Sequence, residues 1–183
     1  RLRLMGFQVL LQRLDDRLVD RCRSVTVFPG TEDVTIDPES NLAYVSADDR
    51  RAAFAGKPVQ GGIYVFDVDN PGVVTKVSSD DFGPFHPHGI SLWRGQGQKR
   101  LFVINHAPEG EKVEIFDVGV QGALTHLESV SFEAMHSPND VLGVGPRQFY
   151  ATNDRGYDTG VMSTLEAWFA LPFSSLVYFD GEK

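Results

Sequence analysis

The hydrophobic pattern of the chain changes character near residue 23. Before that point, apolar side chains recur at three- and four-residue steps and arginines lie off the apolar stripe, as in an amphipathic helix (Leu4, Phe7, Leu11, Leu14 and Leu18). From Val25 onward, short β-branched and aromatic runs are separated by turn residues, which is typical of antiparallel hairpins. The pattern therefore predicts an amphipathic helix over residues 1–22 and an all-β domain over residues 23–183.

The predicted N-terminal helix has two interpretations. It can pack its apolar stripe across one end of the domain. It can also lie on a membrane surface, because basic residues beside an apolar face suit anionic lipid. We therefore keep membrane-surface contact through this helix as an alternative.

Three units with the same order of elements follow one another in the β region. Strands are expected at 31–37, 42–46, 62–68 and 73–78, then at 88–93, 101–105 and 113–118, and finally at 139–144, 149–153 and 175–180. The outer strands share one pattern, Ile-Tyr-Val-Phe-Asp, Val-Glu-Ile-Phe-Asp and Leu-Val-Tyr-Phe-Asp. The units align Glu32, His88 and Asn139, which are 56 and 51 residues apart.

A repeat of this length with four strands per unit indicates β-propeller blades. Propellers close with about 4 to 8 blades, so about three blades form part of a ring. We expect the remaining blades to come from the rest of the chain or from a second chain. Residues 1–183 by themselves are then expected to be inactive.

The repeat register also predicts a site. The innermost strand of each blade lines the central channel, so Glu32, His88 and Asn139 should converge. The next strand is antiparallel and returns to the same rim, where the alignment places Ala47, His106 and Asp154. Two further carboxylates, those of Asp33 and Asp140, follow one residue deeper.

Oxygen-rich, thiolate-free ligands of this kind favour calcium, which takes about 6–8 oxygen ligands. Zinc fits less well, because His88 and His106 lack both helical i,i+4 spacing and a thiolate partner. Taken singly, Glu32-Asp33 resembles a solvated strand end and Asn139-Asp140 an ordinary turn. Taken as one set at matching positions, these polar groups would be costly to bury without a shared partner.

Proton transfer is the chemistry that two histidines at one rim suggest. His88 and His106 could relay a proton from water at neutral pH, or each could simply bond to a backbone carbonyl. The other histidines lack this register and are interpreted as loop or surface residues (His86, His126 and His136). A serine hydrolase has little support, since the Gly-x-Ser-x-Gly turn is missing from the sequence.

The amino-acid composition of the chain narrows the classes of binding partner and of site that it can have. The formal charge of −8 and the lack of a basic run argue against nucleic acid. A single cysteine, Cys22, excludes an internal disulfide framework and a thiolate zinc cluster. No stretch of the sequence approaches the ~18 apolar residues of a membrane span. The sequence does not define the compartment, for which we favour a secreted, membrane-associated or lumenal location.

Six linked motifs resemble the paraoxonase/arylesterase family over about residues 22–183. They are Thr31-Glu-Asp-Val, Phe85-His-Pro-His-Gly-Ile-Ser91, Phe102-Val-Ile-Asn-His106, Val113-Glu-Ile-Phe116, Ser137-Pro-Asn-Asp-Val141 and Val144-Gly-Pro-Arg-Gln-Phe-Tyr-Ala-Thr-Asn-Asp154. The resemblance implies a six-bladed propeller with one catalytic and one structural calcium ion. It also implies hydrolysis of lactones, aryl esters and, in some members, organophosphates.

Residue roles follow from the resemblance position by position. Glu32 and Asn139 match ligands of the catalytic calcium, whereas the structural ion matches Asp33, Asp140 and the backbone carbonyl of Ile90. His88 and His106 match the family's histidine dyad, as base and assistant. A nearby family carboxylate matches Asp154, and a cysteine that closes the ring matches Cys22, for which an inert thiol is the alternative.

Three functions stay open on the sequence. The first is a calcium-dependent lactonase or arylesterase. The second is a strictosidine synthase-like or gluconolactonase-like propeller, against which the Glu32 and Asn139 pair argues. The third is a non-catalytic propeller that binds partners, and it would tolerate changes to both histidines.

Overall fold

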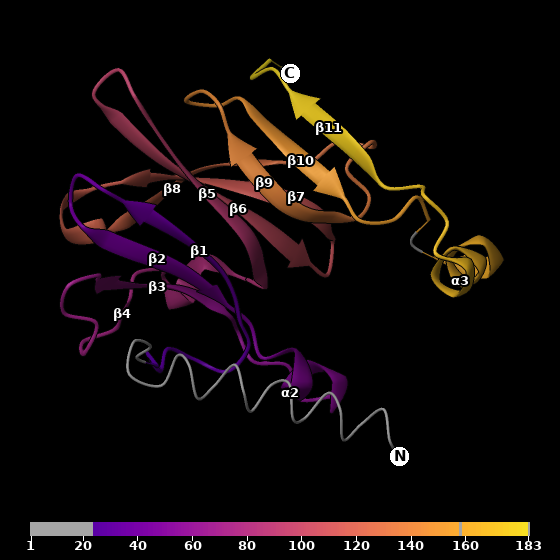
Figure 1. Cartoon of the computed structure of the whole chain (residues 1–183), viewed down its shortest axis with the longest axis horizontal. Coiled ribbons are helices and arrows are strands. Elements are labelled where there is room, and N and C mark those ends of the chain that lie inside the picture. The colour runs from indigo at the N-terminus through magenta and orange to yellow at the C-terminus, as the bar shows by residue number, and fades with distance from the viewer. Residues whose placement is uncertain (1–23, 158, 183) are drawn as a thin grey trace, which may run out of the picture.

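The computed structural model describes residues 24–157 and 159–182. The predicted helix over residues 1–22, and Cys22 with it, lie outside the described residues. Three antiparallel sheets follow one another in the described part of the chain (Figure 1), with the order β1-β2-β3-β4, then β5-β6-β7-β8, then β11-β10-β9. The protein is thus mostly β, and its three sheets are consistent with partial propeller blades.

The strand bounds agree with the predicted pattern to within three residues, except that the strand expected at 73–78 is only the short β4. The first sheet consists of β1 (Thr31–Asp37), β2 (Leu42–Ala47), β3 (Gly62–Asp67) and β4 (Thr75–Lys76); the second of β5 (Pro87–Gly95), β6 (Gln98–Ala107), β7 (Gly110–Val118) and β8 (Leu124–Val130); the third of β9 (Pro138–Gly143), β10 (Phe149–Asn153) and β11 (Ser175–Phe179). The hydrophobic alternation of the sequence is therefore that of real strands, in the expected order.

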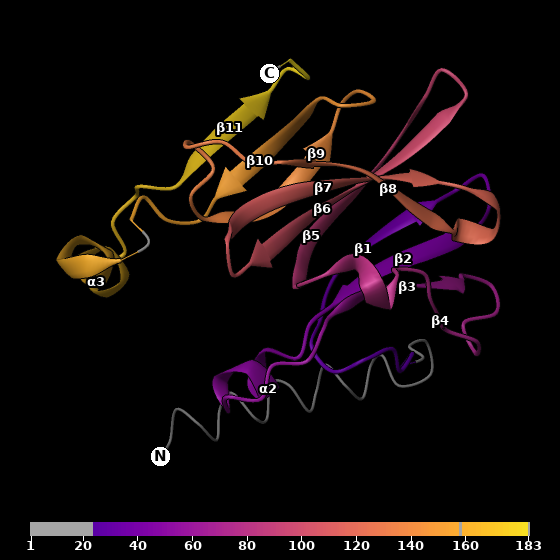
Figure 2. The same cartoon turned by 180° about the vertical axis from the view of Figure 1, so that it is seen from behind.

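Several elements were not predicted. They are β8, the helices α2 (Arg50–Phe54) and α3 (Gly160–Phe169), and the 3-10 turns η1 (Asp80–Phe82) and η2 (Val120–Gly122). β8 pairs with β7 through an irregular register between Ile115 and Phe116, which interrupts the simple alternation. Both α helices lie beyond the same end of the strands, as the two opposite views show (Figures 1 and 2). In the described part of the chain, no helix combines the length and the apolar character needed to cross a membrane.

The middle sheet is buried on both faces. Successive side chains of β6 point to opposite sides, so Leu101 and Val103 pack toward the first sheet, with Tyr44 and Ile63. The alternate residues Phe102 and Ile104 join a second core shared with the third sheet, with Phe149 and Val141. This explains why the centre of β6, Leu101 to Ile104, is a continuous apolar run rather than an alternation of apolar and polar residues.

A buried carboxylate at the β1–β2 turn joins the first sheet to the second. Asp37 is 1% exposed and accepts hydrogen bonds from the Glu39 amide (3.1 Å) and the Ser40 hydroxyl (2.7 Å). Lys99 Nζ of β6 lies 2.5 Å from Asp37 Oδ2. Burial opposes ionisation, but the hydrogen bonds from Lys99, Ser40 and the turn outweigh it and lower the pKa of Asp37.

Replacing Asp37 with Asn keeps the size of the side chain and removes the charge that Lys99 pairs with. We expect the free energy of unfolding at neutral pH to fall by about 1–3 kcal/mol, measured by urea denaturation. Because the folded pKa is lowered, the carboxylate's contribution is fully present above its unfolded pKa of about 3.9 and is lost as the pH falls through the folded value. The difference in free energy of unfolding between Asp37→Asn and wild type should therefore shrink in acid. A difference that stays constant there would contradict the lowered pKa of Asp37.

Candidate functional site

Each inner strand carries one extra residue at the predicted site. Thr31 of β1 is paired with Ala47 of β2, and the next pair is Val34 with Val45. Three residues along β1 therefore match two residues along β2. The same offset occurs in β5, between Pro87 and Ile90. In β9 it occurs between Pro138 and Asp140. Such bulges re-aim side chains and raise the local twist, and they contain Glu32, His88 and Asn139.

Gly89 allows the second and third sheets to meet at these bulges. A Cβ atom on Gly89 would lie 2.6 Å from the carbonyl oxygen of Asn139 and 2.8 Å from Oδ1 of Asp140. Both distances are far below a van der Waals contact, so only glycine fits between the two inner strands. The glycine that follows His88 is therefore needed for the strand carrying this histidine to lie close to β9.

Polar contacts join the first and second sheets at the same level. Asp33 Oδ2 accepts a hydrogen bond from the amide of Ile90 (2.8 Å). The buried Ser46 hydroxyl donates to the carbonyl of His88 (2.5 Å) and accepts from the amide of Asp33 (3.1 Å). The backbone on both sides of Gly89 is thus tied to β1 and β2.

The two predicted histidines are in direct contact. His88 Nδ1 lies 3.0 Å from His106 Nε2. On the other side of the ring, His88 Nε2 lies 3.3 Å from Glu32 Oε2, and Arg50 Nε lies 3.4 Å from Glu32 Oε1. Burial lowers the pKa of His88, as do the Arg50 and His106 charges, whereas Glu32 and Asp154 act the other way. The neutral imidazole, which can accept a proton, is therefore favoured.

The histidine pair faces an open cavity of about 900 Å³. Asn139 and Asp154 line it, as do Arg50 of α2 and Arg155. Asp154 accepts a hydrogen bond from the hydroxyl of Ser137, which holds it at the start of β9. Strand residues of the second and third sheets thus line one space, the segment after β2 adds Asp48 and Arg50, and Glu32 contacts His88 without lining the cavity itself.

Asp33 and Asp140 lie behind this lining. The Asp140 carboxylate accepts from the amide of Val141 (2.8 Å), while Asp33 bonds to the backbone of β1 and β5. Within residues 24–157 and 159–182, no three His, Cys, Asp or Glu side chains form a ready group of metal ligands. The oxygen donors at the bulges are carboxylates and an amide distributed over neighbouring sheets.

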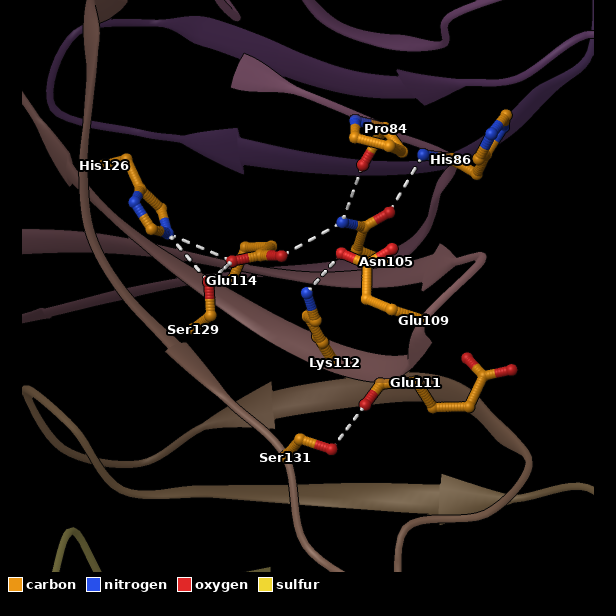
Figure 3. Close-up of polar contacts among 10 residues, drawn as sticks. All are labelled: Pro84, His86, Asn105, Glu109, Glu111, Lys112, Glu114, His126, Ser129 and Ser131. Atoms are coloured by element: carbon orange, nitrogen blue, oxygen red, sulfur yellow. Dashed lines mark hydrogen bonds and ion pairs between the residues drawn. The ribbon is translucent and has the colours of Figure 1, made fainter.

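Buried amides hold the segments that lead into the inner strands. Asn105 precedes His106 and is 1% exposed; its Oδ1 accepts from the amide of His86 (2.9 Å) and its Nδ2 donates to Glu114 (3.0 Å), as Figure 3 shows. The equivalent Asn153 of the third sheet accepts from the amide of Ser137 (3.2 Å) and donates to the carbonyl of Ala134 (2.8 Å).

These amides were missed at the sequence level, although a signal for them exists. The repeat alignment places Ser46, Asn105 and Asn153 one position before the predicted rim residues. All three are buried polar residues. A repeated small polar residue at the end of an apolar strand is thus the pattern that would have identified the supporting contacts.

Two histidines interpreted as loop or surface residues also line the cavity. His86 Nδ1 lies 3.0 Å from Oδ1 of Asp48, a mostly buried carboxylate that lines the cavity as well. His136 lines the cavity too, and its Nε2 contacts the carbonyl of Arg155 (2.9 Å). His126 lies elsewhere, 3.0 Å from the buried Glu114.

Three sheets of repeated pattern, with the candidate residues Glu32, His88 and Asn139 on the bulges of their first strands, define a repeat-built β protein. Comparison with known proteins gives the family. The profile of the family described as Arylesterase matches residues 27–183. The chain belongs to the paraoxonase/arylesterase family.

Named relatives support the assignment. Serum paraoxonase/arylesterase 2 of Gallus gallus is 32% identical over 99% of this chain, and its Rattus norvegicus counterpart is 35% identical over 88%. Serum paraoxonase/lactonase 3 of Oryctolagus cuniculus is 32% identical over 84%. The chain covers 54%, 48% and 46% of these proteins, so it spans about half the length of the relatives it matches.

Replacing Gly89 with Ala should disrupt the site through packing alone. The added methyl group must push β5 away from β9, at a cost of about 1–3 kcal/mol in the free energy of unfolding. We expect a lower melting temperature and loss of any activity that depends on His88. Gly72→Ala is the matched control, because the nearest atom to its Cβ is 3.8 Å away. Equal effects of the two substitutions would show that the close approach at Gly89 is unimportant.

Proposed function

We propose that the protein is a calcium-dependent hydrolase of lactones and aryl esters. The observation that carries the proposal is the His88–His106 contact, 3.0 Å long, with Glu32 on the next bulge 3.3 Å from the outer nitrogen of His88. A partly buried base, a neighbouring carboxylate and an open cavity are the parts that activation of a hydrolytic water requires. Membership of the paraoxonase/arylesterase family supports the same chemistry.

The donor chemistry around the bulges suits a hard cation. Glu32 and Asn139 would hold a catalytic calcium ion. Asp33, Asp140 and the backbone carbonyl of Ile90 would hold a structural one. All of these ligands present oxygen, the atom that calcium prefers. Calcium at the first site would supply a Lewis acid for the substrate carbonyl and a counter-charge for the oxyanion.

The protein's own side chains would perform the proton transfer. His88 would accept a proton from water at Nε2, the nitrogen on the side of the ring facing Glu32. His106, in contact with Nδ1, would hold the ring in this orientation. The cavity, at about 900 Å³, falls within the range of about 300–1,000 Å³ typical of sites for small organic molecules.

We infer in addition that the sheets belong to a six-bladed propeller, with the other blades supplied by further residues of the natural protein or by a second chain. The outer face of the third sheet supports this. Its side chains Leu142, Tyr150, Leu176 and Tyr178 are exposed, and the two tyrosine rings are 4.6 Å apart. A further blade would cover this apolar face.

Calcium should raise the melting temperature of the complete protein, because a ligand specific for the folded state stabilises it. Glu32→Gln or Asn139→Ala should weaken calcium binding and abolish hydrolysis. Isothermal titration with calcium and turnover of a phenyl ester in excess chelator are the measurements. Full turnover in the presence of the chelator would overturn the metal-dependent mechanism.

Removing the base should separate proton transfer from metal binding. His88→Gln is expected to lower kcat for lactones or phenyl esters by about 10²–10⁴-fold, with calcium affinity nearly unchanged. His106→Gln should cost less. His126→Gln is a control at a histidine outside the cavity, assayed together with its melting temperature. If neither cavity substitution changed hydrolysis, the histidine pair would not be the base.

A further inference from the structure

A third ionisable side chain extends the histidine pair. Glu111 Oε2 lies 2.6 Å from His106 Nδ1, on the side of the ring opposite His88. Both Glu111 and His106 line the cavity and are about one-third exposed, at 30% and 32% of the side chain. Glu32, His88, His106 and Glu111 therefore form one continuous row of contacts.

The β6–β7 hairpin places Glu111 there by its register. The two strands turn over two residues, Pro108 and Glu109, between the paired Ala107 and Gly110. The next pair is His106 with Glu111, and directly opposed residues project to the same face of a sheet.

Two further observations fix the direction of the Glu111 side chain. The Ser131 hydroxyl donates to the Glu111 carbonyl (2.8 Å) and holds its backbone. Glu114, three residues on along the strand, points to the other face and into the Asn105 network, and Figure 3 shows the two carboxylates directed apart.

The Glu111 carboxylate determines which ring nitrogens of His106 and His88 carry a proton. An ionised carboxylate can only accept hydrogen bonds, so His106 must carry its proton on Nδ1. Neutral His106 then has a bare Nε2, which must accept a hydrogen bond from Nδ1–H of His88. In the proposed function the Glu32 oxygens would be bound to calcium and would not need a proton from the ring, so neutral His88 is left with its lone pair on Nε2, the nitrogen nearest Glu32.

We propose that Glu111 is a positioning residue that sets the tautomer and orientation of His106, and through it presents the Nε2 lone pair of His88 to the hydrolytic water. The inference rests on the proposed role of His88 as the base. When His88 takes a proton from water at Nε2, the positive charge is shared along the row toward Glu111. No proton needs to leave Nδ1 of either ring.

Nearby charges distinguish Glu111 from an ordinary surface acid. The adjacent cation, Lys112, pairs with Glu109 at 2.7 Å, in the hairpin loop and away from the cavity. Glu109→Gln therefore removes an identical charge two residues away without touching the histidines. It is the matched control for Glu111→Gln.

The test uses the complete protein loaded with calcium, as wild type, Glu111→Gln, Glu111→Asp and Glu109→Gln. Nitrogen-15 NMR of the imidazole rings, with His106 assigned by comparison with His106→Gln, reports the tautomer. We expect Nδ1-protonated His106 in the wild type and in Glu109→Gln. In Glu111→Gln the amide can donate to Nδ1, so the tautomer should shift toward Nε2 protonation.

Kinetics supply the second readout. Glu111→Gln should lower kcat by about 10–100-fold with KM within about twofold, a size typical of lost orienting partners. Glu111→Asp keeps the carboxylate and should recover part of that loss. Melting temperatures of all variants separate these effects from unfolding.

The outcomes are distinct. An unchanged His106 tautomer and unchanged kcat in Glu111→Gln would overturn the inference, as would equal losses in Glu109→Gln. A Glu111-dependent tautomer in a wild-type protein that hydrolyses neither lactones nor esters would confirm the row and refute the proposed function.

Discussion

The close approach of three inner strands is the constraint on which the site depends. Side chains normally keep strands of different sheets well apart, yet here β5 must pass β9 of the next sheet at a distance that excludes even a methyl group on Gly89. On its other side, β5 is tied to β1 through Asp33 and the Ser46 hydroxyl. The bulge in each strand interrupts the regular pairing at this level. Of the three candidate residues on the bulges, His88 and Asn139 line the cavity and Glu32 contacts His88.

The histidine pair combines burial with a directed hydrogen-bond chain. Burial and the Arg50 charge lower the pKa of His88, which keeps its ring neutral. A neutral ring, however, has two tautomers, and burial does not choose between them. The choice needs a fixed acceptor at the far end of the row, where the structure places Glu111 at 2.6 Å from His106. In the proposed mechanism, the pKa of the base and the direction of its lone pair would thus have separate structural causes.

Much of this arrangement is predictable because the repeat carries positional information. The alignment of Glu32 with His88 and Asn139 predicts that three strand ends lie at one level and that the second strands return His106 and Asp154 to it. The structure adds a bulge at each of these strand ends, which the alignment does not predict. The six-bladed ring and the calcium roles stay predictions. α3 was missed because it lies in a connection outside the repeat, and β8 because its irregular pairing with β7 disrupts the alternation.

Glu111 was missed for a different reason. Repeat alignment identifies residues that share a position in successive units, whereas Glu111 belongs to a hairpin contact inside a single sheet. Only the strand pairing shows that it lies opposite His106. The amides Asn105 and Asn153 do repeat, but a buried polar residue at the end of an apolar strand is readily interpreted as the start of a turn.

The two-faced burial of the middle sheet has a consequence for motion. His106 belongs to β6, whose side chains pack into both hydrophobic cores at once. Local opening of that strand would have to break both cores, so its amides should exchange with solvent only through near-global unfolding. The ring that orients His88 is therefore carried by the slowest-exchanging part of the fold. Arg50 on α2 and Arg155 after β10, by contrast, reach the cavity from segments that can move without disturbing it.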